Sequence, residues 1–558
     1  MINVAVYPSR ERVVAEFFEL FKTEWIQHVP GEPCSILLTD GIVPSDRSAS
    51  LCIIFSPEPQ ADDLPSNDAR SSPLTGCPVR LSDGSEFPVY TACRFFHQAG
   101  EPLIVDLSGR VLAYKKTENG RVQIRVGYDL FDEMTYLLST GQPPENAAIP
   151  SLDRQIAFVR RCILDAGLPV LEIPPCPPGH PYMVCLTHDV DFVSICQYGF
   201  GRTFWGFAKR AFIGSFKQIR KKNLTARGLL KNYAAVFSVP LIHLGVLKDF
   251  WMQFDAYRRI EDPHRSTFFL ISFKGQAGEK VSDSRPELRA TRYDVADVRD
   301  DALGLLENGW EIGLHGIDAW HSVDHARREK ERMDSVLGRN ISGVRMHWLC
   351  RDDQTEKRLD AAGFEFDSTF GYNETVGFRA GTSQVFMPLQ ARRLLEVPLH
   401  IQDVALFYPA FLDLDDRSAW NRCATVFEHQ NAAGGVLTVL WHMRSLAPER
   451  LWGGFYQRLL KQFEQDQAWF GTAAEVAAWF RSRRQVQMSL NVASDGEWRV
   501  RLQGEPGTKM TVRIYHPVHF SDETLPSFTD WVWNGQLDLR TGLYEKPKSR
   551  LLHERGAA

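Results

Sequence analysis

The feature that most constrains the fold is an alternation of strand-like and helix-like segments between residues 182 and 484. Seven short runs rich in apolar and β-branched residues are separated mostly by segments with helical periodicity. This alternation predicts a parallel sheet that is covered by helices and closes into a barrel-like α/β fold. The predicted strands are residues 183–187, 266–271, 310–315, 343–348, 364–368, 394–401 and 436–442.

Polar side chains that can bind a metal or transfer a proton follow these predicted strands. In barrel proteins the chemistry gathers at the carboxyl ends of the strands. Asp189 and Asp191 end the first strand and point to one face, because side chains alternate along a strand. One carboxylate can then bind a metal while the other acts as a base; taken alone, the pair could equally be a helix cap. The other strand-end residues are His315, Arg345 with His347, Asp367, Asp403 and His442.

Asp191 and His315 together predict a divalent-metal site of the hydrolytic type. Such sites combine imidazole and carboxylate ligands and leave positions open for water and substrate. The third ligand stays open between His321, in the loop after the third strand, and His347, at the end of the fourth. Zinc is the first expectation for the ion, with cobalt and nickel as alternatives.

Four segments in this order resemble the polysaccharide deacetylase family, the NodB-homology enzymes of carbohydrate esterase family 4. They are residues 187–191, 311–315, 345–348 and 440–442. The resemblance covers roughly residues 180–484. It implies a distorted (β/α)7 barrel of NodB type and an enzyme, a metal-dependent hydrolase that removes an N-acetyl group from an amino sugar.

The resemblance also implies roles for single residues. Asp189 corresponds to the general base, and Arg345 to the arginine that holds it. Asp191 and His315 correspond to metal ligands. His442 corresponds to the acid that protonates the departing amine.

The sequence departs from the family in the second metal histidine. That histidine usually comes four residues after the first, where this chain has Ala319. His321 would replace it through a longer loop, or His347 would supply an imidazole from a position that is often proline in the family.

Four further residues are predicted to bind substrate: Asp367, Trp348, Arg379 and Arg444. Arg379 stands in a polar loop between glycines, where it would bind a phosphate or carboxylate in bidentate fashion or else hold its own loop. Arg444 follows the last predicted strand and would face the same groove.

Residues 192–248 interrupt the alternation. These 57 residues contain ten Lys or Arg and neither Asp nor Glu, and aromatic residues such as Trp205 and Phe216 are interleaved with the bases. An aromatic, basic helix of this kind can lie on an anionic membrane or bind another polyanion. The alternative is a solvated helical hairpin that covers the barrel.

The rest of the chain divides into smaller predicted units. Residues 1–145 are expected to form an α/β accessory domain, 146–180 a helix and a Pro-rich linker, 181–485 the catalytic barrel, and 486–558 a small β-sandwich-like domain. The ten scattered cysteines form no Cys-x-x-Cys pair and predict a reducing compartment. Because residues 1–7 lack the pattern of a secretory signal, we expect a cytoplasmic protein that contacts the inner face of a membrane.

The substrate expected from these observations is an amino-sugar glycan or a lipid- or nucleotide-linked sugar of surface polysaccharide biosynthesis, and no nucleic acid is expected. Two alternatives remain open. One is a deformylase or O-acetyl esterase of the same fold. The other is a non-catalytic carbohydrate- or lipid-binding protein that has lost turnover.

Overall fold

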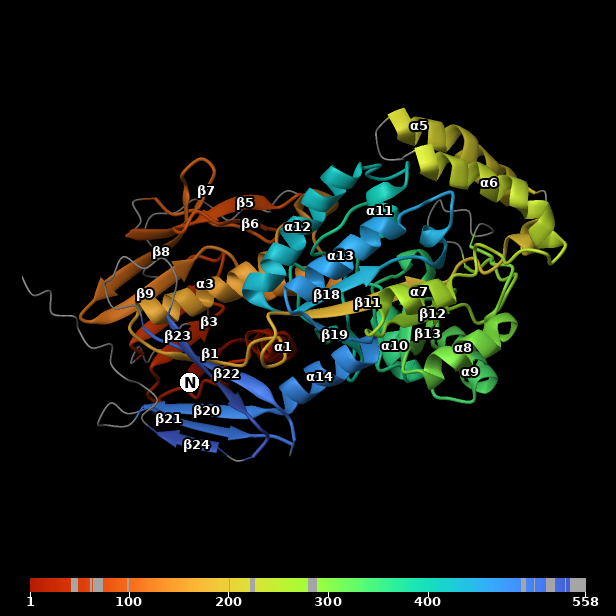
Figure 1. The fold of residues 1–558 in the computed structure, drawn as a ribbon. Helices are drawn as coiled ribbons and strands as arrows, with labels where there is room; N and C mark the ends of the chain where they lie inside the picture. The colour runs from red at the N-terminus through yellow and green to blue at the C-terminus, as the bar shows by residue number, and fades with distance from the viewer. Residues whose placement is uncertain are drawn as a thin grey trace, which may run out of the picture.

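The computed structural model has a mixed α/β fold with a curled parallel sheet, which confirms the α/β part of the predicted fold class (Figure 1). Within the part of the chain that it describes, the strands form four sheets, and no helix is both long and apolar enough to cross a membrane. The residues described are 1–41, 49–60, 63, 74–97, 100–199, 201–220, 226–279, 289–492, 498–505, 507–517, 527–536 and 538–541.

A curled parallel sheet forms the centre of the molecule. Its strands run in the order β16-β15-β14-β13-β12-β11-β18-β17, and β19 (Trp469–Gly471) pairs with β11 beside this path. Each strand of this path lies close to a predicted one, whereas β19 is not predicted from the sequence. The bounds are β11 (Met183–Asp189), β12 (Thr267–Leu270), β13 (Glu311–Gly316), β14 (Gly343–Met346), β15 (Phe366–Asp367), β16 (Leu395–Glu396), β17 (Leu399–Gln402) and β18 (Val436–Leu440).

The segment predicted as one strand at residues 394–401 is divided into β16 and β17. β16 pairs with β15, whereas β17 pairs with β18 at the other edge of the sheet. Between them, the backbone N–H of Val397 still donates to Asp367 (2.8 Å), and Pro398 has no N–H to continue that ladder. The sheet therefore curls until one short segment supplies both of its edges, which brings the strand ends around a common centre.

Helices cover the outside of the central sheet, and β11 is buried over its whole length as a result. Their ends follow local signals. Ser322 caps the start of α9 by accepting from the N–H of His325, and Gly338, in the left-handed region (φ 65°), ends it. The covering helices are α7 (Phe254–Glu261), α8 (Arg299–Glu307), α9 (Val323–Leu337), α10 (Thr355–Ala362), α11 (Asp403–Phe407), α12 (Asp416–Ala433), α13 (Gly453–Gln465) and α14 (Ala473–Gln485).

The first 130 residues contribute a nine-stranded mixed sheet, ordered β2-β1-β3-β4-β9-β8-β7-β5-β6. Its core also takes in Phe370 and Ala380, so it packs directly on loops of the central sheet. The bounds are β1 (Ile2–Ala5), β2 (Trp25–Gln27), β3 (Ile36–Thr39), β4 (Leu51–Phe55), β5 (Cys77–Leu81), β6 (Glu86–Val89), β7 (Glu101–Asp106), β8 (Val111–Glu118), β9 (Arg121–Val126), with helices α1 (Glu11–Phe21), α2 (Leu130–Ser139) and α3 (Ser151–Asp165).

Two three-stranded antiparallel sheets follow α14. They are β20-β21-β24 and β10-β22-β23, and β10 comes from the segment before the central sheet. The bounds are β10 (Val170–Glu172), β20 (Gln487–Val492), β21 (Trp498–Gln503), β22 (Met510–Tyr515), β23 (Phe528–Trp533) and β24 (Asp538–Thr541). Residues 542–558 of the predicted β domain lie outside the described residues, and the predicted domain boundaries stay predictions.

Residues 192–248, called the insertion from here on, are largely helical where the structure describes them. The insertion contains α4 (Arg202–Lys209), a π-helical turn at Arg210–Gly214, α5 (Ser215–Arg220) and α6 (Ala226–His243). It packs in a small core with Trp251 and Ala447 through α4 and through Ala235, Val239 and Ile242 of α6. The helices α5 and α6 protrude from the rest of the molecule (Figure 1). Residues 200 and 221–225 of the insertion lie outside the described residues.

Candidate active site

Side chains at the end of β11 point to two opposite sides, one packed within the protein and one lining a cavity. His188 points away from the centre of the sheet, where its ring contacts Glu261 Oε1 (2.7 Å) and the carbonyl of Trp441 (2.8 Å). Asp189 and Asp191 point to the other side and line a common cavity. The alternation of side chains along the strand therefore produces the separation that the sequence predicts.

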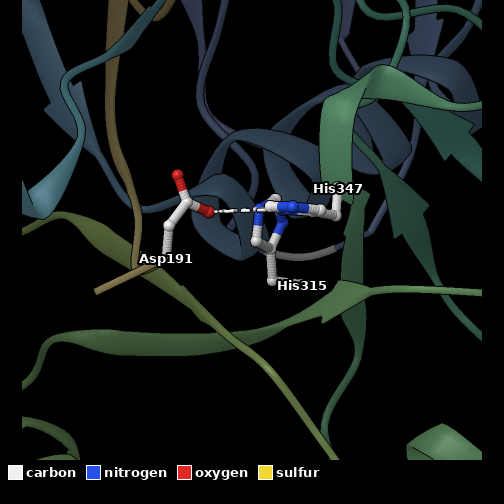
Figure 2. Close-up of side chains that lie close together, drawn as sticks. All are labelled: Asp191, His315 and His347. Carbon is white, nitrogen blue, oxygen red and sulfur yellow. Dashed lines mark hydrogen bonds and ion pairs between the residues drawn. The ribbon is translucent and has the colours of Figure 1, made fainter. Parts of the chain in front are cut away.

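Asp191, His315 and His347 form a compact group that could hold a metal ion. The Asp191 carboxylate points at the two imidazoles, which come from the ends of β13 and β14 (Figure 2). Asp191 Oδ1 lies 3.4 Å from His315 Nε2 and 3.2 Å from His347 Nδ1, and these two nitrogens are 3.0 Å apart.

The chemistry of these three residues fits a divalent metal. Ligand atoms bonded to zinc at about 2.0–2.1 Å in a tetrahedron are about 3.3 Å from one another, close to the observed spacing. His315 donates its Nδ1–H to the carbonyl of Arg345 (3.0 Å), so its Nε2 presents a lone pair to the centre of the group. Asp191 Oδ1 is buried and accepts no hydrogen bond from the described residues.

The electrostatics also favour a charged Asp191. Burial disfavours its carboxylate form, but the neighbouring imidazoles of His315 and His347 hold its pKa well below the usual range. Burial lowers the pKa of His347, so this imidazole is neutral near pH 7, as a metal ligand must be.

His321 does not belong to this group. Its side chain is exposed beside α9, with its ring 5.3 Å from that of Trp320 and 6.0 Å from that of His325. The chain turns sharply just after His347, because Trp348 (φ 61°) and Leu349 (φ 52°) both adopt left-handed conformations.

Asp189 is held by a buried arginine. Arg345 Nη1 donates to Asp189 Oδ1 (3.1 Å) and to Thr187 Oγ1 (2.7 Å). The rest of the guanidinium is held by Ser368, through its carbonyl (2.9 Å) and its hydroxyl (2.7 Å). The other carboxylate oxygen of Asp189 lies 3.7 Å from His315 Nε2, so this acid faces the candidate metal group with one oxygen free to accept a proton.

His442 lies on the opposite side of the group and is held by Asp403. Asp403 Oδ1 contacts His442 Nδ1 (2.7 Å), and Asp403 Oδ2 accepts from the His442 backbone N–H (2.7 Å). Burial by itself lowers the pKa of His442, but the charge of Asp403 and the hydrogen bond to it raise that pKa to about 9. The protonated ring presents Nε2 toward Asp191 Oδ2, 3.9 Å away.

From the sequence, Asp403 is predicted only as a strand-end acid, without a role. Asp403 opens α11 directly after β17, and its partner His442 follows β18, so the pair forms only because β17 and β18 are neighbours in the sheet. The signal that would have found it is an acid and a histidine at the ends of two adjacent strands.

These groups line one cavity of about 700 Å³ at the strand ends. Of the four predicted substrate-binding residues, Trp348 and Arg444 line it, and Trp348 is 41% exposed. Arg210, Tyr408 and Arg450 are among the lining residues that sequence reasoning missed.

Asp367 and Arg379 do not line this cavity. Asp367 is buried beneath the strand ends, where it accepts from the hydroxyl of Thr369 (2.5 Å) and burial raises its pKa to about 7. Arg379 donates to the carbonyl of Gly371 (2.7 Å) and packs 5.0 Å from the Phe370 ring, so it holds its own loop.

No protein-family model and no curated protein matches this sequence. Solved structures similar to the chain include polysaccharide deacetylases of carbohydrate esterase family 4. A candidate polysaccharide deacetylase from Mycobacterium smegmatis is 15% identical, over 56% of this chain and 95% of that one, with a TM-score of 0.34. The peptidoglycan deacetylase PdaC from Bacillus subtilis is 10% identical, over 54% and 93%, with a TM-score of 0.24.

A third similar structure is a pseudoenzyme of the same family whose activity was restored by mutation. It is 12% identical, over 55% of this chain and 72% of that one, with a TM-score of 0.25. At these identities and scores, what the protein does must be inferred from its own residues.

Proposed function

We propose that this protein is a metal-dependent N-deacetylase of an amino sugar, built on a distorted barrel of NodB type in which the sixth predicted strand is divided into β16 and β17. The proposal rests on one observation: three kinds of functional group lie together at one cavity. These are a group suited to a metal, a carboxylate held by Arg345, and an imidazolium held by Asp403. Hydrolysis of an unactivated amide needs all three: a polarised carbonyl, a base for water and an acid for the leaving nitrogen.

Asp191, His315 and His347 would hold the metal, with zinc as the expected ion. A divalent ion there would polarise the acyl carbonyl and lower the pKa of a water molecule. Asp189 accepts the proton of the attacking water through the oxygen that Arg345 leaves free. His442 donates its proton to the amide nitrogen as the C–N bond breaks, which releases acetate and a free amine.

The first experiment measures metal and acetate together. Wild-type protein is expected to contain about one zinc per chain and to release acetate from N-acetylated amino sugars. Asp191→Ala, His315→Ala and His347→Ala should each lose the metal, because each removes one of three ligands. The matched control is His321→Ala, which removes an exposed imidazole from the neighbouring loop and should keep the metal.

The outcomes separate the alternatives. Formate release, or release of acetate from an oxygen ester only, would favour a deformylase or O-acetyl esterase of the same fold. Failure to bind zinc, cobalt or nickel after reconstitution would contradict the proposal and leave a non-catalytic carbohydrate-binding protein. Loss of metal in His321→Ala but not in His347→Ala would reverse the assignment of the third ligand.

The proposal includes contact with an anionic membrane through residues 192–248, which suits a lipid-linked intermediate of surface polysaccharide biosynthesis. Support comes from apolar side chains exposed on α5 and α6, among them Phe216 (59% exposed) and Phe237 (72%). The same segment carries ten basic residues and no acidic ones. Apolar side chains that enter a bilayer between bases that face anionic headgroups would bind it peripherally.

Flotation with lipid vesicles tests this contact. The protein should float with vesicles rich in phosphatidylglycerol and not with pure phosphatidylcholine. The double variant Phe216→Ser/Phe237→Ser should bind at least about tenfold more weakly, because each ring contributes about 1.5–3 kcal/mol when buried. Leu74→Ser is the control, since Leu74 is 92% exposed on the N-terminal region. Equal binding by both variants would contradict the membrane contact.

A further inference from the structure

Three arginines line the same cavity as the candidate metal group. Arg210 belongs to the π-helical turn of the insertion, and Arg444 and Arg450 follow β18. All three line the cavity that holds Asp191 and His442. Arg210 and Arg450 also line an adjoining cavity of about 170 Å³, so the cluster stands where the two cavities meet.

The positive charge of this cluster is only partly neutralised within the protein. Arg444 Nε donates to Glu449 Oε1 (2.6 Å), an oxygen that also accepts from the indole of Trp251 (3.1 Å). No carboxylate of the described residues lies within 4 Å of the guanidinium of Arg210 or Arg450. The Nε atom of Arg450 is buried without a hydrogen-bond partner.

The guanidinium groups are close enough to disfavour one another. Burial, followed by the charges of Arg444 and Arg210, lowers the pKa of Arg450 to about 10, although the charge of Asp403 opposes this. Burial and the charge of Arg444 likewise lower the pKa of Arg210. The charge of Glu449 opposes the shift in both residues. An anion bound among the three guanidinium groups would offset the remaining repulsion.

Aromatic rings hold the cluster in place without neutralising it. Arg444 lies 4.0 Å over the ring of Trp251, and Arg210 lies 5.4 Å over that of Tyr408. These ring faces fix the planar guanidinium groups while leaving N–H groups free to donate. The cluster is therefore prepared for a ligand with several acceptor oxygens.

We propose that Arg210, Arg444 and Arg450 bind a phosphate group attached to the anomeric oxygen of the amino sugar, so that the substrate is a sugar phosphate or diphosphate. This inference rests on the proposed deacetylation. In a 2-acetamido sugar the amide and the anomeric oxygen are on adjacent carbons, so an amide at the candidate metal group leaves the phosphate within one sugar ring of it. Guanidinium groups recognise phosphate by paired, charge-assisted hydrogen bonds. The insertion would thus contribute directly to substrate choice.

Binding of defined sugars to the full-length chain tests the proposal. The chain carries Asp189→Asn to prevent turnover, and calorimetry compares N-acetylglucosamine with its 1-phosphate. The phosphate should strengthen binding about tenfold or more, as expected of charged hydrogen bonds. Arg210→Gln and Arg450→Gln should each remove most of that gain. Lys209→Gln removes an exposed charge from the adjacent position of the insertion and should leave the gain intact.

Two further ligands identify the source of the phosphate. Uridine diphosphate N-acetylglucosamine represents a nucleotide carrier, and farnesyl diphospho-N-acetylglucosamine represents a lipid carrier. Tighter binding of either ligand than of N-acetylglucosamine supports the site and names its carrier. Equal affinity for the free and phosphorylated sugars, or no effect of Arg210→Gln and Arg450→Gln in folded protein, would overturn it.

An acetate-release assay on chains without Asp189→Asn, run beside the calorimetry, keeps the two proposals apart. Phosphate-dependent binding without acetate release by the wild type would sustain the arginine site and reject the reaction. Acetate release from unphosphorylated sugar, unchanged in Arg210→Gln, would sustain the reaction and reject the site.

Discussion

The two walls of the candidate active-site cavity are built in different ways. The inner wall, defined as Asp189, Asp191, His315 and His347, comes from the ends of β11, β13 and β14. Two of its side chains, Asp189 and His315, are hydrogen-bonded to Arg345. The outer wall, defined as Arg210, Trp348, Tyr408, Arg444 and Arg450, comes from loops and the insertion.

The difference suggests a division of labour. Strand ends of a curled sheet hold groups within a few tenths of an ångström, which proton transfer and metal binding require. Loops and insertions can vary without disturbing the sheet, which suits recognition of one substrate among many. We therefore expect the inner wall to carry rate and stability, and the outer wall to carry selectivity.

The largest expected effect is that of Asp189→Asn on the inner wall. The amide cannot accept the proton of the attacking water, so kcat should fall by about 10³- to 10⁴-fold. The metal content should stay at the wild-type level, because Asp189 is no member of the candidate ligand group. Acetate release and metal analysis on the same preparation check both points. A fall of less than tenfold would remove Asp189 from the role of base.

The second largest effect is expected for the free energy of unfolding of Arg345→Met. Arg345→Met leaves Asp189 as a buried carboxylate without its partner and removes the hydrogen bonds to Ser368 and Thr187. Loss of one partner of a buried ion pair costs about 3–5 kcal/mol, which urea unfolding would measure. Arg210→Gln on the outer wall provides the comparison and should change stability by no more than about 0.5 kcal/mol. Similar losses in both variants would break the distinction between the walls.

A smaller effect is expected for Asp403→Asn. The asparagine keeps the shape of the side chain but cannot support a charged His442, so kcat should fall by about 10²-fold. The metal content should be unaffected. Asp416→Asn, at an exposed position at the start of α12, is the control and should have wild-type kcat. A mere change in KM would place Asp403 among the groups that only shape the cavity.

The smallest effect is expected for Trp348→Ala on the outer wall. The exposed indole offers a ring face to a sugar at the mouth of the cavity, so its loss should raise KM by about threefold to tenfold and leave kcat within about twofold. Steady-state kinetics with N-acetylglucosamine 1-phosphate would show this. Trp205→Ala, which removes a more exposed indole (64%) from the insertion, should leave both parameters unchanged. A large fall in kcat would instead move Trp348 to the inner wall.

The parts of the site that the sequence predicts depend on local rules. Asp189 and Asp191 share a face because side chains alternate along a strand, and the alternation of strands and helices predicts that strand ends meet. The predicted positions of His315, His347 and His442 follow from the same rule, since each comes directly after a buried apolar run.

The remaining features of the site depend on how loops fold, which no local sequence pattern encodes. The choice between His321 and His347 depends on how the loop after β13 folds, and the sequence leaves it open. Arg379 and Arg444 are both predicted to bind substrate, yet Arg379 is bound to its own loop whereas Arg444 lines the cavity.

The sequence by itself determined the fold class, the strands and the residues at their ends, because apolar periodicity and side-chain alternation act over a few residues. Only the tertiary structure decided that Asp403 supports His442 and that Arg210 joins Arg450 over a separation of 240 positions. Such pairs form when a curled sheet and a packed insertion bring distant segments together. Such pairs leave no pattern in the sequence around either residue, so the sequence alone does not reveal them.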